Sequence, residues 1–226
     1  MTVSHPRWVG LVAIVTVTAC GGATGSARTP PQTATDARGE VSTAVQAKPD
    51  STRYPYTEAD VRFMSHMIGH HAQAIVMAGL APTHDASDAI RRLAERIVNA
   101  QQDEIRTMQQ WLRERRLPVP EARPTGMTMT HGGVEHEMLM PGMLTPAQMK
   151  QLDAARGKDF DRLFLTFMIQ HHKGAVSMVK DLFGSYGAGL DETVFKFASD
   201  VNVDQSTEIE RMQTMLIALL IDTRSP

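Results

Sequence analysis

Hydrophobic and polar positions follow a helical period in four long segments between residues 57 and 222. In the first segment, apolar and histidine positions recur at spacings of three and four residues: Phe63, Met67, His70, Ala74, Met77 and Ala78. Such spacing places them on one face of an α-helix, with His71 at the margin of that face. The same period runs through residues 90–112, 159–183 and 194–216. No run alternates with period two for long enough to indicate a strand, so the pattern predicts an all-α fold.

Local signals mark where these helices begin and where they stop. Thr57 can cap a helix that starts after it, and the acidic Glu58 and Asp60 favour a first turn there. A shorter helix is predicted after Thr145, because proline follows at the first helical position and Gln at the third. Residues 118–144 cannot form one helix, since they contain four prolines and four glycines.

The segments on either side of residues 118–144 are copies of one another. Residues 63–77 match residues 164–178 without a gap, and the Gln-x-x-Glu-Ile-x-x-Met segment at 101–108 recurs at 205–212. The matched order implies that a helical hairpin was duplicated, which predicts a four-helix bundle. We expect the bundle in residues 54–226, divided into a first hairpin at 54–117, a connector at 118–144 and a second hairpin at 145–222.

The residues before the bundle are typical of an export signal followed by a tether. A basic start, a short apolar run at residues 8–18 and small residues before Cys20 have the layout of a lipoprotein signal. We expect residues 1–19 to be removed and Cys20 to carry lipid, which would anchor the protein to a membrane of the cell envelope, in the periplasm or on the outer surface. Residues 20–53 are rich in Thr, Ala, Pro and Ser and should form a disordered tether.

Cysteine content, charge and motifs exclude several kinds of site. Cys20 is the only cysteine, so a disulfide within the chain and a cysteine-based zinc or thiol site are excluded. The formal charge of −2 comes without a clustered basic face, so no nucleic-acid partner is expected. The chain has no Gly-x-Ser-x-Gly segment and no phosphate-binding glycine loop, and we expect it not to be an enzyme.

The unusual feature of the composition is fifteen methionines and nine histidines against twelve aromatic residues. The repeated helical faces bring together His, Met and Glu side chains that we predict as metal ligands: Met67, His70, His71, Met77, Glu104, Met108, Met168, His171, His172, Met178, Glu208 and Met212. Imidazole nitrogen and thioether sulfur together suit copper, and thioether favours the Cu(I) state. A copper ion is therefore the expected cofactor.

A metal-free explanation of the same residues stays open. A buried polar group without a partner costs about 1–3 kcal/mol, so these histidines need neighbours. Glu104 could accept a hydrogen bond from His70 and Glu208 one from His171, and glutamines one turn away could complete the network.

The connector holds a second concentration of sulfur. Its methionines and histidines form a further candidate metal site: Met127, Met129, His131, His136, Met138, Met140 and Met143. A flexible segment with several thioethers could wrap a soft ion, whereas the structural alternative is that these methionines fill irregular gaps at one end of the bundle.

The doubled Met-Ile-x-His-His motif, the two Gln-x-x-Glu-Ile-x-x-Met segments and the stretch from Met140 to Leu165 resemble the bacterial "domain of unknown function 305" family. The resemblance covers residues 54–221 and implies a ferritin-like helical bundle. It also implies copper binding through His and Met, because the family includes periplasmic copper-binding proteins linked to copper tolerance. His66 and Met64 fall outside the matched motif, since Phe167 and Leu165 stand at their positions in the second copy.

Three functions remain in view at the level of the sequence. The first is an envelope lipoprotein that binds copper or another soft metal for sequestration or tolerance. The second is a metal-free helical bundle that binds a partner or has a structural role. The third is a ferritin-like di-iron oxidase, which would normally need Glu on two helices and Glu-x-x-His on the other two. This chain offers two carboxylates in those positions where four are expected.

Overall fold

The computed structural model describes the backbone of residues 56–124, 126–131 and 134–222, all within one compact unit spanning residues 46–226. The side chains of residues 127–131, 134–137 and 222 lie outside this description, as do the expected signal peptide, Cys20 and the tether. Among the described residues, no helix combines the length and apolar character that a membrane span needs.

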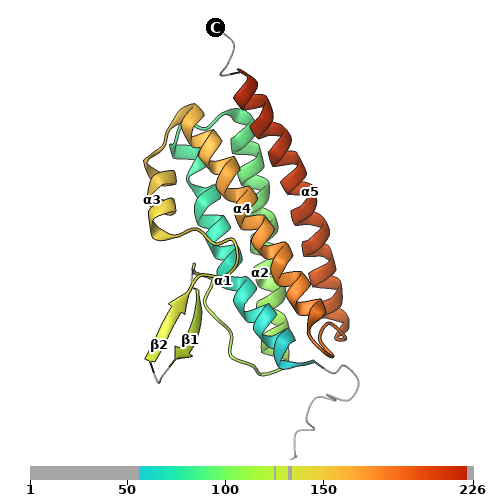
Figure 1. Cartoon of the computed structure of the whole chain (residues 1–226). Coiled ribbons are helices and arrows are strands. Elements are labelled where there is room, and N and C mark those ends of the chain that lie inside the picture. Colours follow the sequence, from blue (N-terminus) through green and yellow to red (C-terminus); the bar gives the residue numbers. More distant parts are fainter. Residues whose placement is uncertain (1–55, 125, 132–133, 223–226) are drawn as a thin grey trace, which may run out of the picture. The chain divides into compact units, whose positions relative to one another are not determined.

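Four long helices lie side by side and form the body of the unit (Figure 1). They are α1 (Glu58–Gly79), α2 (Asp88–Glu114), α4 (Gly157–Gly184) and α5 (Glu192–Asp222), with the short η1 (Ala81–Thr83) and α3 (Pro146–Ala154) between them. Helix α1 packs against α2 and α4, and α4 packs against α5. The all-α, four-helix fold predicted from the period is confirmed.

The predicted helix starts are also confirmed. Thr57 accepts a hydrogen bond from the backbone N–H of Asp60, whose carboxylate accepts one from the backbone N–H of Thr57. Thr145 and Gln148 make the same reciprocal pair before α3. Each pair satisfies backbone donors that the first turn of a helix otherwise leaves unpaired, which fixes where the helix begins.

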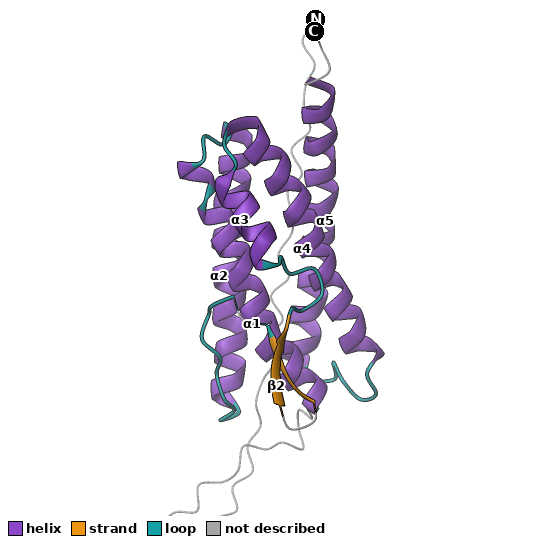
Figure 2. Cartoon of the chain, turned by 60° about the vertical axis from the view of Figure 1, so that its left-hand side comes forward, coloured by secondary structure: helices purple, strands orange, loops and turns teal. Residues whose placement is uncertain are grey.

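The connector differs from the prediction, because it contains two strands where none was expected. Strands β1 (Met127–His131) and β2 (Val134–Met138) pair antiparallel, with Met127 opposite Met138 (Figure 2). Five-residue runs are too short for a convincing period-two signal. The sequence Gly132-Gly133 is nevertheless common in hairpin turns, and it was the one local signal that could have predicted the two strands.

The buried core is divided into two apolar clusters by a layer of polar residues. One cluster includes Phe63, Met67, Ile105, Trp111, Ala175, Phe197 and Val201. The other includes Ala74, Met77, Ile97, Phe160, Met168 and Met212. Each long helix passes from one cluster to the other through the polar layer, so the layer crosses the middle of the bundle.

Candidate metal centre

The polar layer is built from the residues that the sequence repeat matches. Each helix contributes two of them: His70 and His71 from α1, Gln101 and Glu104 from α2, His171 and His172 from α4, and Gln205 and Glu208 from α5. All four imidazoles are fully buried, with no exposed surface. His71, which the helical period placed at the margin of the buried face, is therefore as deeply buried as His70. It is buried because α1 packs against two neighbouring helices and not against one.

His70 and His171 form the centre of the layer. Their rings lie 3.9 Å apart between centroids. The Nε2 atom of His70 lies 2.9 Å from the carbonyl oxygen of Pro141, and the Nε2 atom of His171 lies 3.0 Å from the carbonyl oxygen of His70. A carbonyl oxygen only accepts, so both Nε2 atoms must carry the proton and donate it. The Nδ1 atom of each neutral ring therefore carries a lone pair.

The other two histidines are paired with the glutamates. The Nε2 atom of His172 donates to Glu208 Oε2 at 2.6 Å, and His71 Nε2 lies 2.7 Å from Glu104 Oε2. The first contact is aligned as a hydrogen bond, whereas the second is close but not aligned. The expected pairs of Glu104 with His70 and of Glu208 with His171 are thus wrong. In each case the glutamate contacts the next histidine in the sequence, His71 on α1 and His172 on α4. Adjacent helical positions point about 100° apart, and the first histidine of each pair faces the α1–α4 interface.

All four Nδ1 atoms are buried and have no hydrogen-bond partner among the described residues. The side-chain amide of Gln101 is likewise buried without a partner, and so is Oε1 of Gln205. In the metal-free alternative these glutamines complete the network, but within the described part of the chain these three amide atoms have no partner. A closed network would satisfy such atoms, because each unpaired buried polar group costs about 1–3 kcal/mol.

Burial keeps the central imidazoles neutral. Loss of hydration, with a smaller repulsive effect of His71, lowers the pKa of His70 to about 3. Burial, followed by the neighbouring His70, holds the pKa of His171 well below its usual value. The neutral ring is the form that binds a metal ion, so neither residue has to release a proton first.

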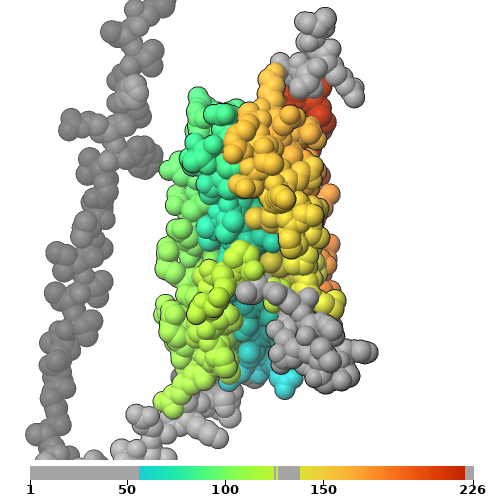
Figure 3. Space-filling view, turned by 90° about the vertical axis from the view of Figure 1, so that its left-hand side faces the viewer, coloured from blue at the N-terminus to red at the C-terminus, as the bar shows by residue number. Residues whose placement is uncertain are grey.

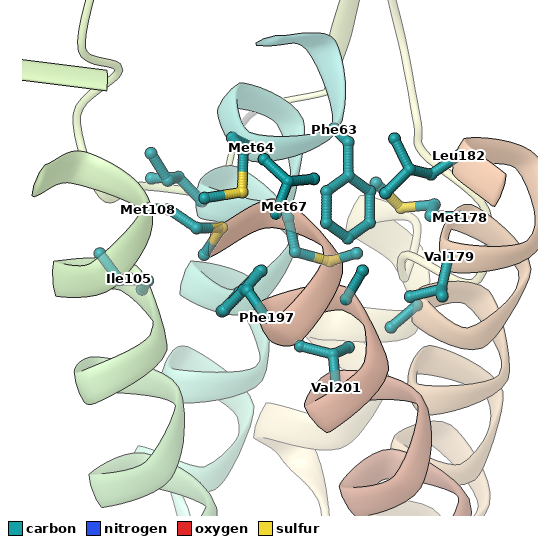
Figure 4. Close-up of a cluster of buried hydrophobic side chains, with 14 of the residues drawn as sticks. Phe63, Met64, Met67, Ile105, Met108, Met178, Val179, Leu182, Phe197 and Val201 are labelled. Atoms are coloured by element: carbon teal, nitrogen blue, oxygen red, sulfur yellow. The ribbon is translucent and has the colours of Figure 1, made fainter. Parts of the chain in front are cut away.

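Thioethers surround the layer on both sides. Met64, Met67, Met108 and Met178 belong to one apolar cluster, where their sulfur atoms lie among Phe63, Phe197 and Val201 (Figure 4). Met77, Met168 and Met212 belong to the cluster on the opposite side of the layer. Met67 and Met168 each precede the first histidine of their helix by three residues, which places them one turn away on the same face.

A turn of the connector closes the layer over the α1–α4 interface. Residues of this segment and of α3 lie across the face formed by α1 and α4, coloured yellow-green to yellow in Figure 3. Gln73 holds the turn through two hydrogen bonds with the backbone of Leu144, and Gln170 donates to the carbonyl oxygen of Gly142. A Cβ atom at Gly174 would lie 1.9 Å from the carbonyl oxygen of Pro141, so only glycine permits this approach.

These docking residues were missed by the sequence analysis. Gln73, Gln170 and Gly174 stand inside α1 and α4, where their partners are distant in sequence. The one available signal was Gly174 in the interior of a long helix, since an isolated helical glycine often marks a close approach of backbone.

The candidate ligands of the connector fall into three groups. Met140 and Met143 are buried in the first apolar cluster, beside the turn that contacts His70. Met138 is about half exposed, at 49%. The side chains of Met127, Met129, His131 and His136 lie outside the described residues, so their proposed role as ligands stays a prediction.

The donor set of the layer decides which metal it fits. Within the described part of the chain, no three His, Cys, Asp or Glu side chains are grouped so that they could hold a metal ion. Besides the imidazoles, the donors that the two flanking clusters contain are thioethers. Such a set matches a soft ion better than iron or zinc.

The family model named "Domain of unknown function (DUF305)" matches residues 60–216. The chain belongs to the DUF305 family. No curated protein sequence is significantly similar to it.

Solved structures of DUF305 proteins resemble the chain in fold and sequence. A protein from Streptomyces coelicolor, described as secreted, is 32% identical, with a TM-score of 0.59 over 71% of this chain and 93% of its own. A fragment from Deinococcus radiodurans is 29% identical, with a TM-score of 0.59 over 72% of this chain and 97% of its own.

Another similar structure, CopM in its Cu(II)-bound form, is 29% identical, with a TM-score of 0.54 over 70% of this chain and 96% of its own. CopM has also been solved with Cu(I) and with silver. These neighbours are named for their family or for the ion they hold, and none of them is named as an enzyme.

Proposed function

We propose that this protein binds copper in its Cu(I) state through the buried His and Met side chains of the polar layer and serves in copper sequestration or tolerance. The central ligands are Nδ1 of His70 and Nδ1 of His171. Thioethers from the flanking clusters complete the coordination. Among these, Met67 and Met168 lie one helical turn before His70 and His171 on the same helix face. His71 and His172 extend the donor set on either side.

One observation carries this proposal: the Nδ1 atom of every imidazole in the layer is buried without a partner among the described residues. The opposite nitrogen, Nε2, is hydrogen-bonded in His70, His171 and His172 and lies 2.7 Å from Glu104 Oε2 in His71. A metal-binding histidine almost always presents its other ring nitrogen to a carboxylate or a backbone carbonyl, which fixes the tautomer and the ring. Here the Nε2 atoms of His71 and His172 face carboxylates, and those of His70 and His171 face carbonyls. In this arrangement Glu104 and Glu208 orient the imidazoles, a different role from the ligand role expected from the sequence.

The softness of the bound ion follows from the same donor set. Cu(I) is a soft, monovalent ion, and neutral imidazole and thioether ligands would bind it without the need for a buried carboxylate ligand. The two carboxylates of the layer already face imidazoles, His71 and His172. These features do not support a di-iron oxidase.

We place the protein in the cell envelope, anchored by lipid at Cys20. The support is the sequence layout of residues 1–20 and the similarity to a family member described as secreted. Mass spectrometry of the protein isolated from its membrane fraction tests this. The expected N-terminal peptide begins at Cys20 and carries acyl chains, and an unmodified Cys20 would refute the anchor.

The metal proposal is tested by competition for Cu(I) against a coloured chelator. We expect the double variant His70→Gln and His171→Gln to bind Cu(I) about 100-fold more weakly than the native chain or worse, because replacing even an outer-shell partner costs 10–100-fold in metal affinity. His84→Gln is the matched control. His84 is also buried but lies outside the layer, and both of its ring nitrogens are hydrogen-bonded, to Thr83 and Asp153.

Equal Cu(I) affinity in the double variant and the native chain would refute the layer as the site. Residual binding that disappears only when Met127, Met129, Met138 and Met140 are replaced would move the site to the connector. Tight iron binding with an oxygen-dependent optical change would favour the oxidase instead.

A further inference from the structure

The polar layer is closed on one side of the bundle and open on the other. On the α1–α4 side, the Pro141–Gly142 turn sits in backbone contact with Gly174 and covers His70. A groove of about 250 Å³ lies beside Pro141 and Met178, but no residue of the layer lines it. An ion that approached from this side would have to displace the turn.

The opposite side has a groove between α2 and α5. Its volume is about 280 Å³, and its walls include Gln101, Glu104, Gln205 and Glu208, which are the contributions of these two helices to the layer. The side chains of Glu104 and Glu208 remain partly exposed, at 19% and 25%, while their Oε2 atoms contact the buried histidines. The two glutamates therefore join the solvent to the imidazoles.

The groove is polar at its base and acidic at one end. Gln101 and Gln205 line the groove and are only 2% and 3% exposed, and the buried side-chain oxygen of each has no hydrogen-bond partner among the described residues. Asp204 adds a third carboxylate, and its pKa is raised by burial and by the negative charges of Glu104, Asp200 and Glu208. Neighbouring carboxylates that repel one another create the negative potential that attracts a cation.

Two arginines, Arg96 and Arg211, also line the groove. Because α2 and α5 run antiparallel, both lie toward the apolar cluster that contains Ile97 and Met212, whereas Asp204 lies toward the other cluster. The repeat has Ala100 at the position that corresponds to Asp204, so the acidic end belongs to the second hairpin alone.

We infer that the groove between α2 and α5 is the entry port for metal ions, in which Asp204, Glu104 and Glu208 attract the cation and the amide oxygens of Gln101 and Gln205 hold it on its way to the imidazoles. This inference rests on the proposed function. It specifies the side from which the ion reaches the layer, and it makes the Pro141–Gly142 turn a fixed cover.

The test measures how fast Ag(I), used as a stable probe for Cu(I), enters the purified apo protein. Samples are mixed with Ag(I), quenched with excess chelator at set times, and counted by native mass spectrometry. Asp204→Lys should slow loading about tenfold, the lower end of the range for electrostatic steering, while the equilibrium affinity stays within twofold. Glu210→Lys is the matched control, because it makes the same charge change at an exposed position of α5 outside the groove.

A second variant tests access without changing charge. Ala100→Trp fills the groove and should also slow loading, whereas Asn99→Trp, an exposed neighbour that does not line it, should not. Native loading rates in both Asp204→Lys and Ala100→Trp would overturn the port and leave the metal site intact. A loss of equilibrium affinity in either variant would make the groove part of the site itself and also overturn the port. Failure of the native chain to bind Ag(I) at all would instead refute the proposed function.

Discussion

Replacing Gly174 by alanine puts a methyl group where the connector already lies. An ideal Cβ at this position is 1.9 Å from the carbonyl oxygen of Pro141, 2.4 Å from the carbonyl carbon of Pro141 and 2.7 Å from Cα of Gly142. All three atoms are backbone, so no side-chain rotation relieves the overlap. The turn must lift away from α4 by more than an ångström.

The cost follows from the contacts that hold the turn. Lifting it removes the acceptor of the buried His70 N–H and separates Gln73 from Leu144. Each buried polar group left unpaired costs about 1–3 kcal/mol, or roughly 4 kcal/mol for the two side chains. The substitution also stabilises the helix by about 1 kcal/mol, because alanine has a higher helix propensity than glycine. We expect a net loss of about 3 kcal/mol, a large share of the 5–15 kcal/mol typical of a domain.

Urea unfolding followed by circular dichroism measures this loss. Gly184→Ala is the control on the same helix, since a Cβ there meets no atom within 4 Å, and it should leave the stability unchanged or slightly higher. A Gly174→Ala variant as stable as the native chain would mean that the turn does not rest on α4. The conclusion that this turn closes one side of the layer would then be wrong.

Three further outcomes follow from the structure. Burial lowers the pKa of His70 below its unfolded value, so the contribution of this residue to stability is present above about pH 6.5 and is lost as the pH falls toward 3. Urea unfolding at pH 4.5 should show a loss of about 3 kcal/mol from this residue. His70→Gln should remove that part of the pH dependence. Asp191→Ala should destabilise the fold by about 3–5 kcal/mol in thermal or urea unfolding, since buried Asp191 accepts hydrogen bonds from Trp111 and Arg115; a loss below 1 kcal/mol would contradict the pairing. Cu(I) should raise the melting temperature of the native chain but not of the variant carrying both His70→Gln and His171→Gln, and an equal rise in both would place the ion elsewhere.

The helices and their duplication could be predicted because their signals are local. Thr57 and Thr145 cap helices through residues three positions away, and the period of apolar residues survives along each segment. The gathering of the His-His pairs in one layer followed from the repeat, since matched positions in duplicated hairpins are related by the symmetry of the bundle.

The partners of those histidines could not be predicted from spacing. His70 and His71 are both buried, and which of them meets Glu104 depends on how α1 is rotated between α2 and α4, a property of the packed bundle. The contact between the Pro141–Gly142 turn and the layer was even harder to predict, because it joins residues far apart in the sequence. Pro141 reaches His70 across 71 positions of sequence, and no pattern near either residue indicates the contact.

The central claim is that Nδ1 of His70 and Nδ1 of His171 receive the metal ion while their Nε2 atoms keep the proton. Nitrogen-15 NMR of the histidine rings, recorded on the apo protein and after addition of Ag(I), distinguishes the two nitrogens of each ring. We expect the protonated Nε2 signals to persist in both states and the Nδ1 signals of these two residues to shift on binding. Unchanged Nδ1 signals in a protein that has bound the ion, or a shift confined to Nε2, would contradict the account.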